Sequence, residues 1–137
     1  MIEIKFREWD EARAEIYHGD ISGISGMSYG VREDFDDMVG FRFAHEENSF
    51  EGKGRLLEQY IGLKDRNGVE IYEGDIIKLH VVILSPDDKI GFVEYIPEFG
   101  YSIKVGDRVI RQEYWAFNTG HTVEVIGNIH ENKELVS

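Results

Sequence analysis

The sequence contains no cysteine and no long hydrophobic run. Small secreted domains often depend on disulfide bonds, so the missing cysteines predict a protein of a reducing cytosol and exclude thiol chemistry. The longest apolar run, residues 79–84, is one strand long, whereas a membrane-spanning helix needs roughly 20 residues. The N-terminus alternates charged and apolar residues, which no signal-peptide core does. We therefore expect a cytosolic protein with no membrane association.

Basic residues are also scarce. Fifteen Lys and Arg residues face 27 Asp and Glu residues, which gives a net charge of −12. The excess divides evenly between residues 1–55 and residues 56–137, so neither part of the chain is basic. Nonspecific binding of nucleic acid gains its affinity by neutralising phosphates. Direct binding to DNA or RNA is therefore disfavoured.

Motifs for catalysis or metal binding are missing as well. The five histidines form no His-x-His or His-x-x-x-His pair, and there is no Gly-x-Ser-x-Gly elbow or phosphate-binding loop. Two weak candidates are the cluster His45-Glu46-Glu47 and the carboxylates Asp34, Asp36 and Asp37, which could hold calcium. Charged surface runs are common, so we favour solvated surface at both places. We predict no catalytic residue, no metal and no cofactor, and we favour a non-enzymatic protein.

Short strand patterns dominate what is present. Residues 2–7 alternate apolar and charged side chains with the period of a strand, and a second strand at residues 14–18 would complete a hairpin. We read residues 19–37 as a long loop, rich in glycine at first and acidic at residues 33–37.

The strand signals sharpen after residue 54. Asn67-Gly68 lies between two apolar runs, which favours a two-residue type I′ turn with a positive φ at Gly68. Gly127 is expected to let a backbone or a bulky ring approach the last strand. Residues 108–120 fit either a strand or a short helix. We expect the other strands at residues 38–43, 56–61, 69–72, 76–84, 90–96, 101–105 and 123–129.

Strands of this length and spacing predict a mainly β protein with little helix. Residues 55–137 are expected to form a small barrel or sandwich-like module. Residues 1–54 are expected to form an N-terminal β-hairpin region with the glycine-rich and acidic loop. The alternative is that the two parts form one continuous domain.

One group of residues could form a ligand cleft. Platforms that stack the bases of single-stranded nucleic acid combine aromatic side chains with a positive groove. The interpretation that we favour is that the aromatic residues are core and cross-strand pairs. The candidate cleft consists of Tyr101, Lys104, Arg108, Tyr114 and Trp115.

Three segments together resemble the YopX family of phage and prophage proteins. They are residues 5–10 (KFREWD), residues 59–76 (QYIGLKDRNGVEIYEGDI) and residues 124–132 (EVIGNIHEN). Their order and spacing extend the resemblance over nearly the whole chain. Two residues depart from the family's pattern, Ile61 in place of threonine and Lys133 in place of a frequent proline. The resemblance implies a phage- or prophage-encoded, largely β protein of the host bacterial cytosol, and it implies no reaction.

Three function classes follow. The first is an accessory protein that acts through protein–protein contacts, as a homo-oligomer and with a host or phage protein as a further partner. Self-association is expected because the strands at residues 76–84 and 123–129 carry apolar residues on both faces. The second is an acidic decoy that imitates nucleic acid and occupies a host DNA-binding protein. The third is a small-ligand or oligonucleotide-binding β-barrel that uses the candidate cleft.

Overall fold

The computed structural model describes residues 4–11, 14, 26–43, 55–81, 89–115 and 121–136. The protein is mainly β, as the strand patterns predict. The chain divides into two compact units, Met1–Gln59 and Tyr60–Ser137, and each unit is described by itself below. None of the helices in the described ranges is long and apolar enough to cross a membrane.

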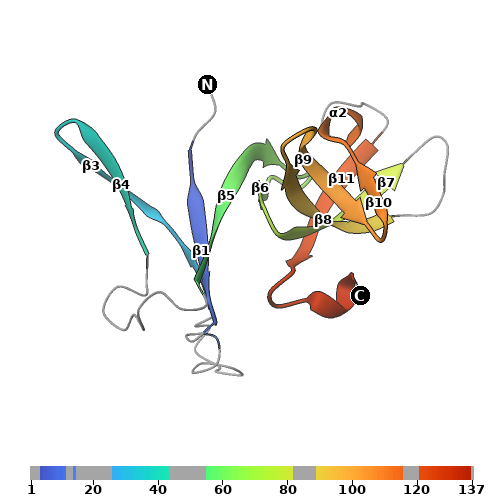
Figure 1. Ribbon diagram of the computed structural model, residues 1–137, viewed down its shortest axis with the longest axis horizontal. Coiled ribbons are helices and arrows are strands. Elements are labelled where there is room, and N and C mark those ends of the chain that lie inside the picture. Colours follow the sequence, from blue (N-terminus) through green and yellow to red (C-terminus); the bar gives the residue numbers. More distant parts are fainter. Residues whose placement is uncertain are drawn as a thin grey trace. The chain divides into compact units, whose positions relative to one another are not determined.

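The first unit contains a small antiparallel sheet and a separate hairpin. Strand β1 (Phe6–Asp10) lies between β2 (Met27–Tyr29) and the first part of β5 (Arg55–Lys64). Strands β3 (Val31–Phe35) and β4 (Met38–Arg42) pair with each other and form a two-stranded sheet of their own (Figure 1).

The partner of β1 corrects two predictions. Strand β2 lies inside the predicted loop of residues 19–37, and Ala14, at the start of the predicted strand 14–18, has a helical backbone. Residues 15–18 lie outside the described ranges. The glycines of this stretch predicted a flexible loop, but Gly26 and Gly30 beside β2 allow neighbouring atoms to approach the backbone closely. A Cβ atom at Gly26 would lie 2.9 Å from the carbonyl oxygen of Asp10, and one at Gly30 would lie 3.0 Å from the Phe43 ring.

The predicted acidic loop of residues 33–37 is also wrong. Glu33 and Asp34 belong to β3, and Asp36 and Asp37 form a two-residue turn that leads into β4. The acidic side chains tolerate a strand here because basic partners lie beside them. Nη1 of Arg42 lies 3.1 Å from Oε1 of Glu33, and this ion pair offsets the low strand propensity of acidic residues.

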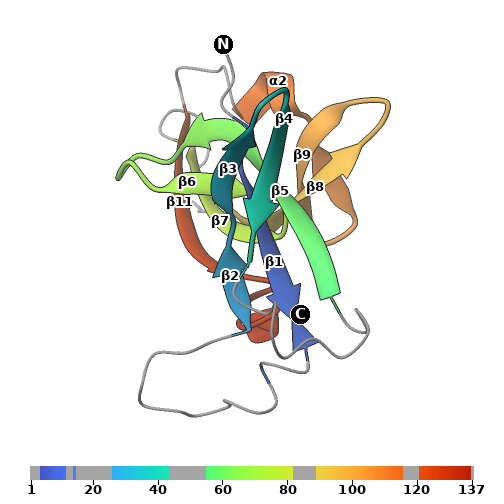
Figure 2. The same cartoon turned by 90° about the vertical axis from the view of Figure 1, so that its left-hand side faces the viewer.

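The second unit is a curled antiparallel sheet in the form of a half-barrel, in the order β10-β9-β8-β7-β11 (Figures 1 and 2). Strand β6 (Glu70–Tyr72) pairs with the second part of β5. Residues 108–120 begin as a strand and continue as a short helix, and residues 116–120 lie outside the described ranges. The remaining elements are β7 (Asp75–Val81), β8 (Lys89–Ile96), β9 (Gly100–Val105), β10 (Arg108–Ile110), α2 (Gln112–Trp115), β11 (His121–Asn128) and the 3-10 helix η1 (Lys133–Leu135).

The hydrophobic core of the second unit follows from the two-residue period of its strands. Ile77 and Leu79 point from β7 into the core, while the alternate residues Lys78 and His80 point to the other face. Strand β7 pairs with β8 on one side and with β11 on the other, so both of its edges are hydrogen-bonded. The buried members of the core are Ile61, Ile71, Ile77, Leu79, Val93, Ile103 and Trp115.

The loop between β5 and β6 confirms the hairpin and the positive φ at Gly68, which is +84°. The turn type differs from the prediction. The N–H of Asp65 donates to the carbonyl of Val69 at 2.8 Å, and the N–H of Gly68 donates to the carbonyl of Asp65 at 3.0 Å. These bonds enclose three residues, as in a hairpin with a glycine bulge, and not the two of a type I′ turn. The Asp65 side chain favours the wider loop because its Oδ1 accepts from the N–H of Asn67 at 2.8 Å.

We expect replacement of Gly68 by valine to lower the free energy of unfolding by about 1–3 kcal/mol, as measured by urea denaturation. A Cβ atom at this position meets no atom within 4 Å, so the cost is backbone strain alone. Gly68→Asn is the matched control, because asparagine tolerates a left-handed backbone and loses less stability. An unchanged denaturation midpoint for the valine variant would contradict the assignment.

The end of β11 corrects the expectation for Gly127. A Cβ atom at Gly127 would lie 2.5 Å from Oδ1 of Asn132, so an amide side chain approaches the strand where we expected a backbone or a ring. The same Oδ1 accepts from the N–H of Asn128 at 3.1 Å. Oδ1 of Asn128 in turn accepts from the N–H groups of His130 and Glu131, at 3.0 and 2.9 Å. The segment 127–132 therefore forms a hydrogen-bonded turn at the end of the sheet.

Candidate functional site

The predicted cleft residues do not share one face of the sheet. Trp115 is buried in the core, and its Nε1 donates to the carbonyl of Tyr101 at 3.1 Å. Tyr101 and Lys104 stand an odd number of residues apart on β9, so their side chains leave opposite faces. Arg108 is exposed on β10, and the side chain of Tyr114 lies outside the described atoms. Trp115 and Tyr101 are therefore brought together, and Lys104 is not.

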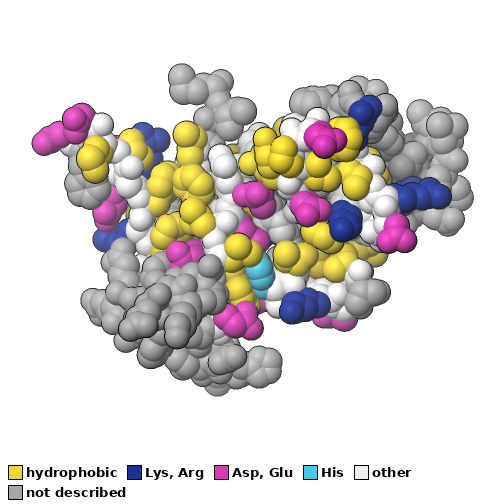
Figure 3. All heavy atoms as spheres, viewed as in Figure 1, with side chains coloured by type: hydrophobic (Ala, Val, Ile, Leu, Met, Phe, Trp, Pro, Cys, Tyr) yellow, Lys and Arg dark blue, Asp and Glu magenta, His cyan; other side chains and the backbone are white. Residues whose placement is uncertain are grey.

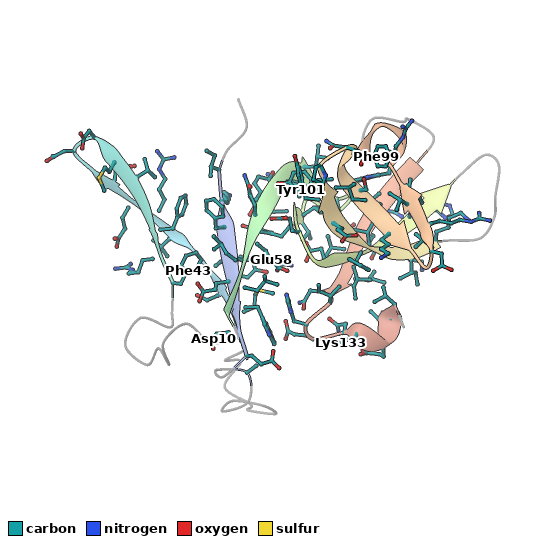
Figure 4. All side chains as sticks on the ribbon, viewed as in Figure 1. Asp10, Phe43, Glu58, Phe99, Tyr101 and Lys133 are labelled. Carbon is teal, nitrogen blue, oxygen red and sulfur yellow. The ribbon has the colours of Figure 1, made fainter. Side chains whose placement is uncertain are left out.

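Tyr101 lies among aromatic and acidic neighbours (labelled in Figure 4). Its ring contacts the Tyr95 ring edge-on, with 5.2 Å between the ring centroids. Burial raises the pKa of the Tyr101 hydroxyl, and the charges of Glu73 and Tyr95 raise it further. Nearby, the Arg111 guanidinium lies 5.2 Å from the centre of the Phe99 ring. These contacts fit cross-strand packing, the interpretation favoured for the aromatic residues.

The candidate metal ligands lie on the hairpin of the first unit. Asp34 accepts a bond from Nε of Arg32 at 3.1 Å, and Asp36 and Asp37 form the exposed turn. His45, Glu46 and Glu47 lie outside the described residues. Within the described ranges, no group of three His, Asp or Glu side chains is placed to hold a metal ion.

Exposed apolar side chains lie on residues 31–42 of the first unit, the β3–β4 arm. The side chains of Val31, Met38 and Val39 are 52%, 65% and 52% exposed. The arm also carries the charged side chains of Arg32, Glu33, Asp34 and Arg42, and Figure 3 shows hydrophobic side chains on the arm beside both acidic and basic ones. Among the described residues neither β3 nor β4 pairs with a further strand, so the arm has two open edges. Open edges with apolar side chains invite another chain.

Aromatic packing anchors the base of the arm to β1. The rings of Phe6 and Phe41 meet edge-on with 5.0 Å between their centroids. The N–H of Gly30, between β2 and β3, donates to the carbonyl of Phe6 at 2.9 Å. The arm is therefore held at its base and exposed towards its turn at Asp36 and Asp37.

A buried ion pair lies in the sheet that carries the arm. Nε of Arg7 on β1 donates to Oε1 of Glu58 on β5 at 2.8 Å, and the two side chains are only 3% and 5% exposed. Arg7 belongs to the first of the three sequence segments. No local pattern identifies its partner Glu58, because the two residues lie 51 positions apart along the chain.

In the second unit, Asp65 links the β5–β6 loop to β11. Its Oδ1 accepts from the N–H groups of Asn67 and Val69 at 2.8 and 2.9 Å, and its Oδ2 accepts from the N–H of Val125 at 2.9 Å. The N–H of Arg66 donates to the carbonyl of Val123 at 2.9 Å. The loop thus provides hydrogen-bond partners for the N–H of Val125 and the carbonyl of Val123 on the outer edge of β11, as a further strand would.

Comparison with known proteins gives a family and a fold. The model of the YopX protein family matches residues 5–137. The crystal structure of protein EF1440 from Enterococcus faecalis is 24% identical, with all of both chains covered and a TM-score of 0.53. The crystal structure of protein yopX from Bacillus subtilis is 18% identical, with 97% of this chain and 98% of that chain covered and a TM-score of 0.51. At these identities the likeness shows a shared fold. No curated protein matches the chain.

Proposed function

This chain belongs to the YopX family, and we propose that it is a phage- or prophage-encoded accessory protein of the bacterial cytosol that acts through protein–protein contacts. The contact surface is the β3–β4 arm, and its partner is the same arm of a second copy. One observation carries the proposal: among the described residues the arm has two unpaired edges and three apolar side chains that are more than half exposed.

The β3–β4 arm is too small to be stable by itself. A two-stranded hairpin is marginally stable in water, and the base of this one packs against β1 through the contact of Phe41 with Phe6. Pairing with a further strand would complete the backbone hydrogen bonds of an edge and cover apolar side chains in one step. Every copy of the chain carries the same strand, so two copies can pair in a symmetric interface.

The sequence of β4 is compatible with pairing to itself. An antiparallel pair centred on Gly40 places Val39 opposite Phe41 of the partner subunit and Met38 opposite Arg42 of the partner subunit. No like charges oppose each other, and the Val39–Phe41 pairs extend the apolar contact at the base of the arm. Strand β3 is less suitable, because a pair centred on its middle residue places Glu33 opposite the partner's Glu33.

Backbone geometry favours the same register. The two-residue turn makes Phe35 and Met38 the closing pair of the hairpin, and the backbone N–H group of each residue points towards the other strand. Inward and outward amides alternate along a strand, so those of Val39 and Phe41 point away from β3. In the pair centred on Gly40, these outward groups of the two copies meet. Four backbone hydrogen bonds can therefore form without any change to the hairpin.

Charge opposes this association. Each copy carries a net charge of −12, so two copies repel each other at low ionic strength. Salt screens the repulsion, and the Debye length falls from about 30 Å at 0.01 M to about 8 Å at physiological ionic strength. We therefore expect association at micromolar concentration to strengthen as salt rises to that level.

Light scattering coupled to size-exclusion chromatography tests the proposal. We expect a mass near twice the 15.8 kDa of one chain at physiological salt. Val39→Lys should return the mass to 15.8 kDa, because it places a charge in the Val39–Phe41 pair while making the protein less acidic. Val31→Glu is the matched control, since Val31 is equally exposed but lies on β3, and it should leave the larger mass unchanged. A monomeric wild-type protein at both low and physiological salt would contradict the proposal.

A further inference from the structure

A polar cavity lies on the second unit, on the face of β7 and β11 that points away from the core. The strand register places Lys78 opposite Glu124 and His80 opposite Thr122. These four side chains and Arg66 line a cavity of about 240 Å³. The chain folds this way because the core takes Ile77 and Leu79 of β7 and Val123 and Val125 of β11, which leaves the polar side chains between and beside them on the other face.

The lining is basic in a protein that is acidic as a whole. The lining holds two basic side chains, Arg66 and Lys78, and one acidic side chain, Glu124, whereas the chain as a whole carries a net charge of −12. The backbone of Arg66 is fixed beside β11 by its bond to Val123. The adjacent carboxylate of Asp65 is engaged by three backbone N–H groups.

Thr122 supplies a second, independent observation. Its Oγ1 is buried and has no hydrogen-bond partner in the described part of the protein. Buried hydroxyl groups are nearly always paired, because leaving one unpaired costs free energy. An unpaired hydroxyl in the lining of a cavity indicates a missing hydrogen-bond partner. Beside Arg66 and Lys78, a negatively charged hydrogen-bond acceptor fits that place.

We propose that this cavity binds the oxyanion of a small ligand, either a phosphate monoester or a carboxylate. The Arg66 guanidinium and the Lys78 ammonium supply charge-assisted hydrogen bonds, and the Thr122 hydroxyl donates a third. Glu124 accepts from a hydroxyl or amine of the same ligand. The cavity is smaller than the roughly 300–1,000 Å³ of sites for drug-sized molecules, so the ligand is a compact one. This site is separate from the arm, and its function does not depend on self-association.

Titration of ¹⁵N-labelled protein with inorganic phosphate, and separately with acetate at equal ionic strength, tests the site by NMR. We expect saturable shifts of the amide signals of Arg66, Lys78, His80 and Thr122, with millimolar affinity for these minimal probes. Tighter binding of phosphate than of acetate identifies a phosphate ligand, and the reverse order a carboxylate ligand. Arg66→Gln should weaken binding about tenfold, which corresponds to about 1.4 kcal/mol. The control Arg108→Gln, at an exposed position on β10, should leave binding unchanged.

Thr122→Val separates a binding role from a structural one. The valine has nearly the same shape and no hydroxyl, so it should raise the urea midpoint of the ligand-free protein while weakening phosphate binding. The inference is overturned if neither probe gives saturable shifts at these residues. It is also overturned if Arg66→Gln and Thr122→Val bind as wild type does, or if Thr122→Val only loses stability.

Discussion

Replacement of Arg7 by methionine is expected to lower the free energy of unfolding by about 3–5 kcal/mol, the largest effect that we predict. The change keeps an apolar chain of similar length but removes the guanidinium that lies 2.8 Å from the buried carboxylate of Glu58. A buried charge that loses its partner retains its desolvation penalty. Urea unfolding followed by tryptophan fluorescence would measure the effect, since Trp9 is buried on the same strand.

An exposed ion pair of the same unit provides the control. Nε of Arg32 lies 3.1 Å from Oδ1 of Asp34, with side chains that are 55% and 72% exposed. Arg32→Met should change the stability by less than about 1 kcal/mol, because water screens an exposed pair. The double variant Arg7→Met/Glu58→Leu should recover part of the loss, since it removes both buried charges of the pair. Equal effects of Arg7→Met and Arg32→Met would contradict a role for burial.

Asp65→Asn is expected to cost about 2–4 kcal/mol, the second-largest effect. The aspartate accepts three backbone hydrogen bonds through two oxygens, and asparagine has only one acceptor oxygen. Its NH₂ group would face at least one backbone N–H, in the loop or on β11. Asp107→Asn, in the exposed turn between β9 and β10, is the matched control and should leave the urea midpoint unchanged.

The pH dependence of stability gives a second readout for Asp65. Burial raises the pKa of this carboxyl, but the hydrogen bonds from Val125, Val69 and Asn67 and the charge of Arg66 outweigh it and lower the pKa below its ordinary value. A carboxyl whose pKa is lowered by folding stabilises the protein above its unfolded pKa of about 4 and loses that contribution as the pH falls through the folded value.

The difference in stability between wild type and Asp65→Asn should therefore be full near pH 7 and shrink below about pH 4. Urea midpoints measured across that range would show this. A difference that stayed constant into acid would mean that the carboxylate charge contributes nothing and that asparagine acts through its shape alone.

Local patterns were sufficient to predict most strands of the second unit, whereas residues 108–120, which contain β10 and α2, fitted either a strand or a helix. The alternation of side chains in residues 55–105 and the glycine of the β5–β6 loop depend on neighbouring residues, so they are visible in the sequence. The first unit depends on distant partners. Strand β2 is only three residues long, and it is identified by its pairing with β1 and not by its own composition. The same is true of the Arg7–Glu58 pair, which 51 residues separate along the chain.

The candidate sites were less predictable for a related reason. Tyr101, Lys104 and Trp115 are close in sequence, but strand alternation and core packing send Lys104 to one face and the other two towards the core. Arg66 and Thr122 are far apart in sequence and line the same cavity. The exposure of Val39 on the arm depends on which strands lie beside it, and composition alone carries no information about that.

One measurement tests the central claim most directly, namely that two copies pair through β4. The chain has no cysteine, so Gly40→Cys introduces a single thiol at the centre of the proposed symmetric pair. Opposite residues in a pair without mutual hydrogen bonds have Cα atoms about 4.5 Å apart, within the range that a disulfide spans. After mild oxidation, we expect Gly40→Cys to become a disulfide-linked dimer, while Glu33→Cys and Asp107→Cys remain monomeric under denaturing conditions. Cross-linking of Gly40→Cys no greater than that of Asp107→Cys would contradict the account.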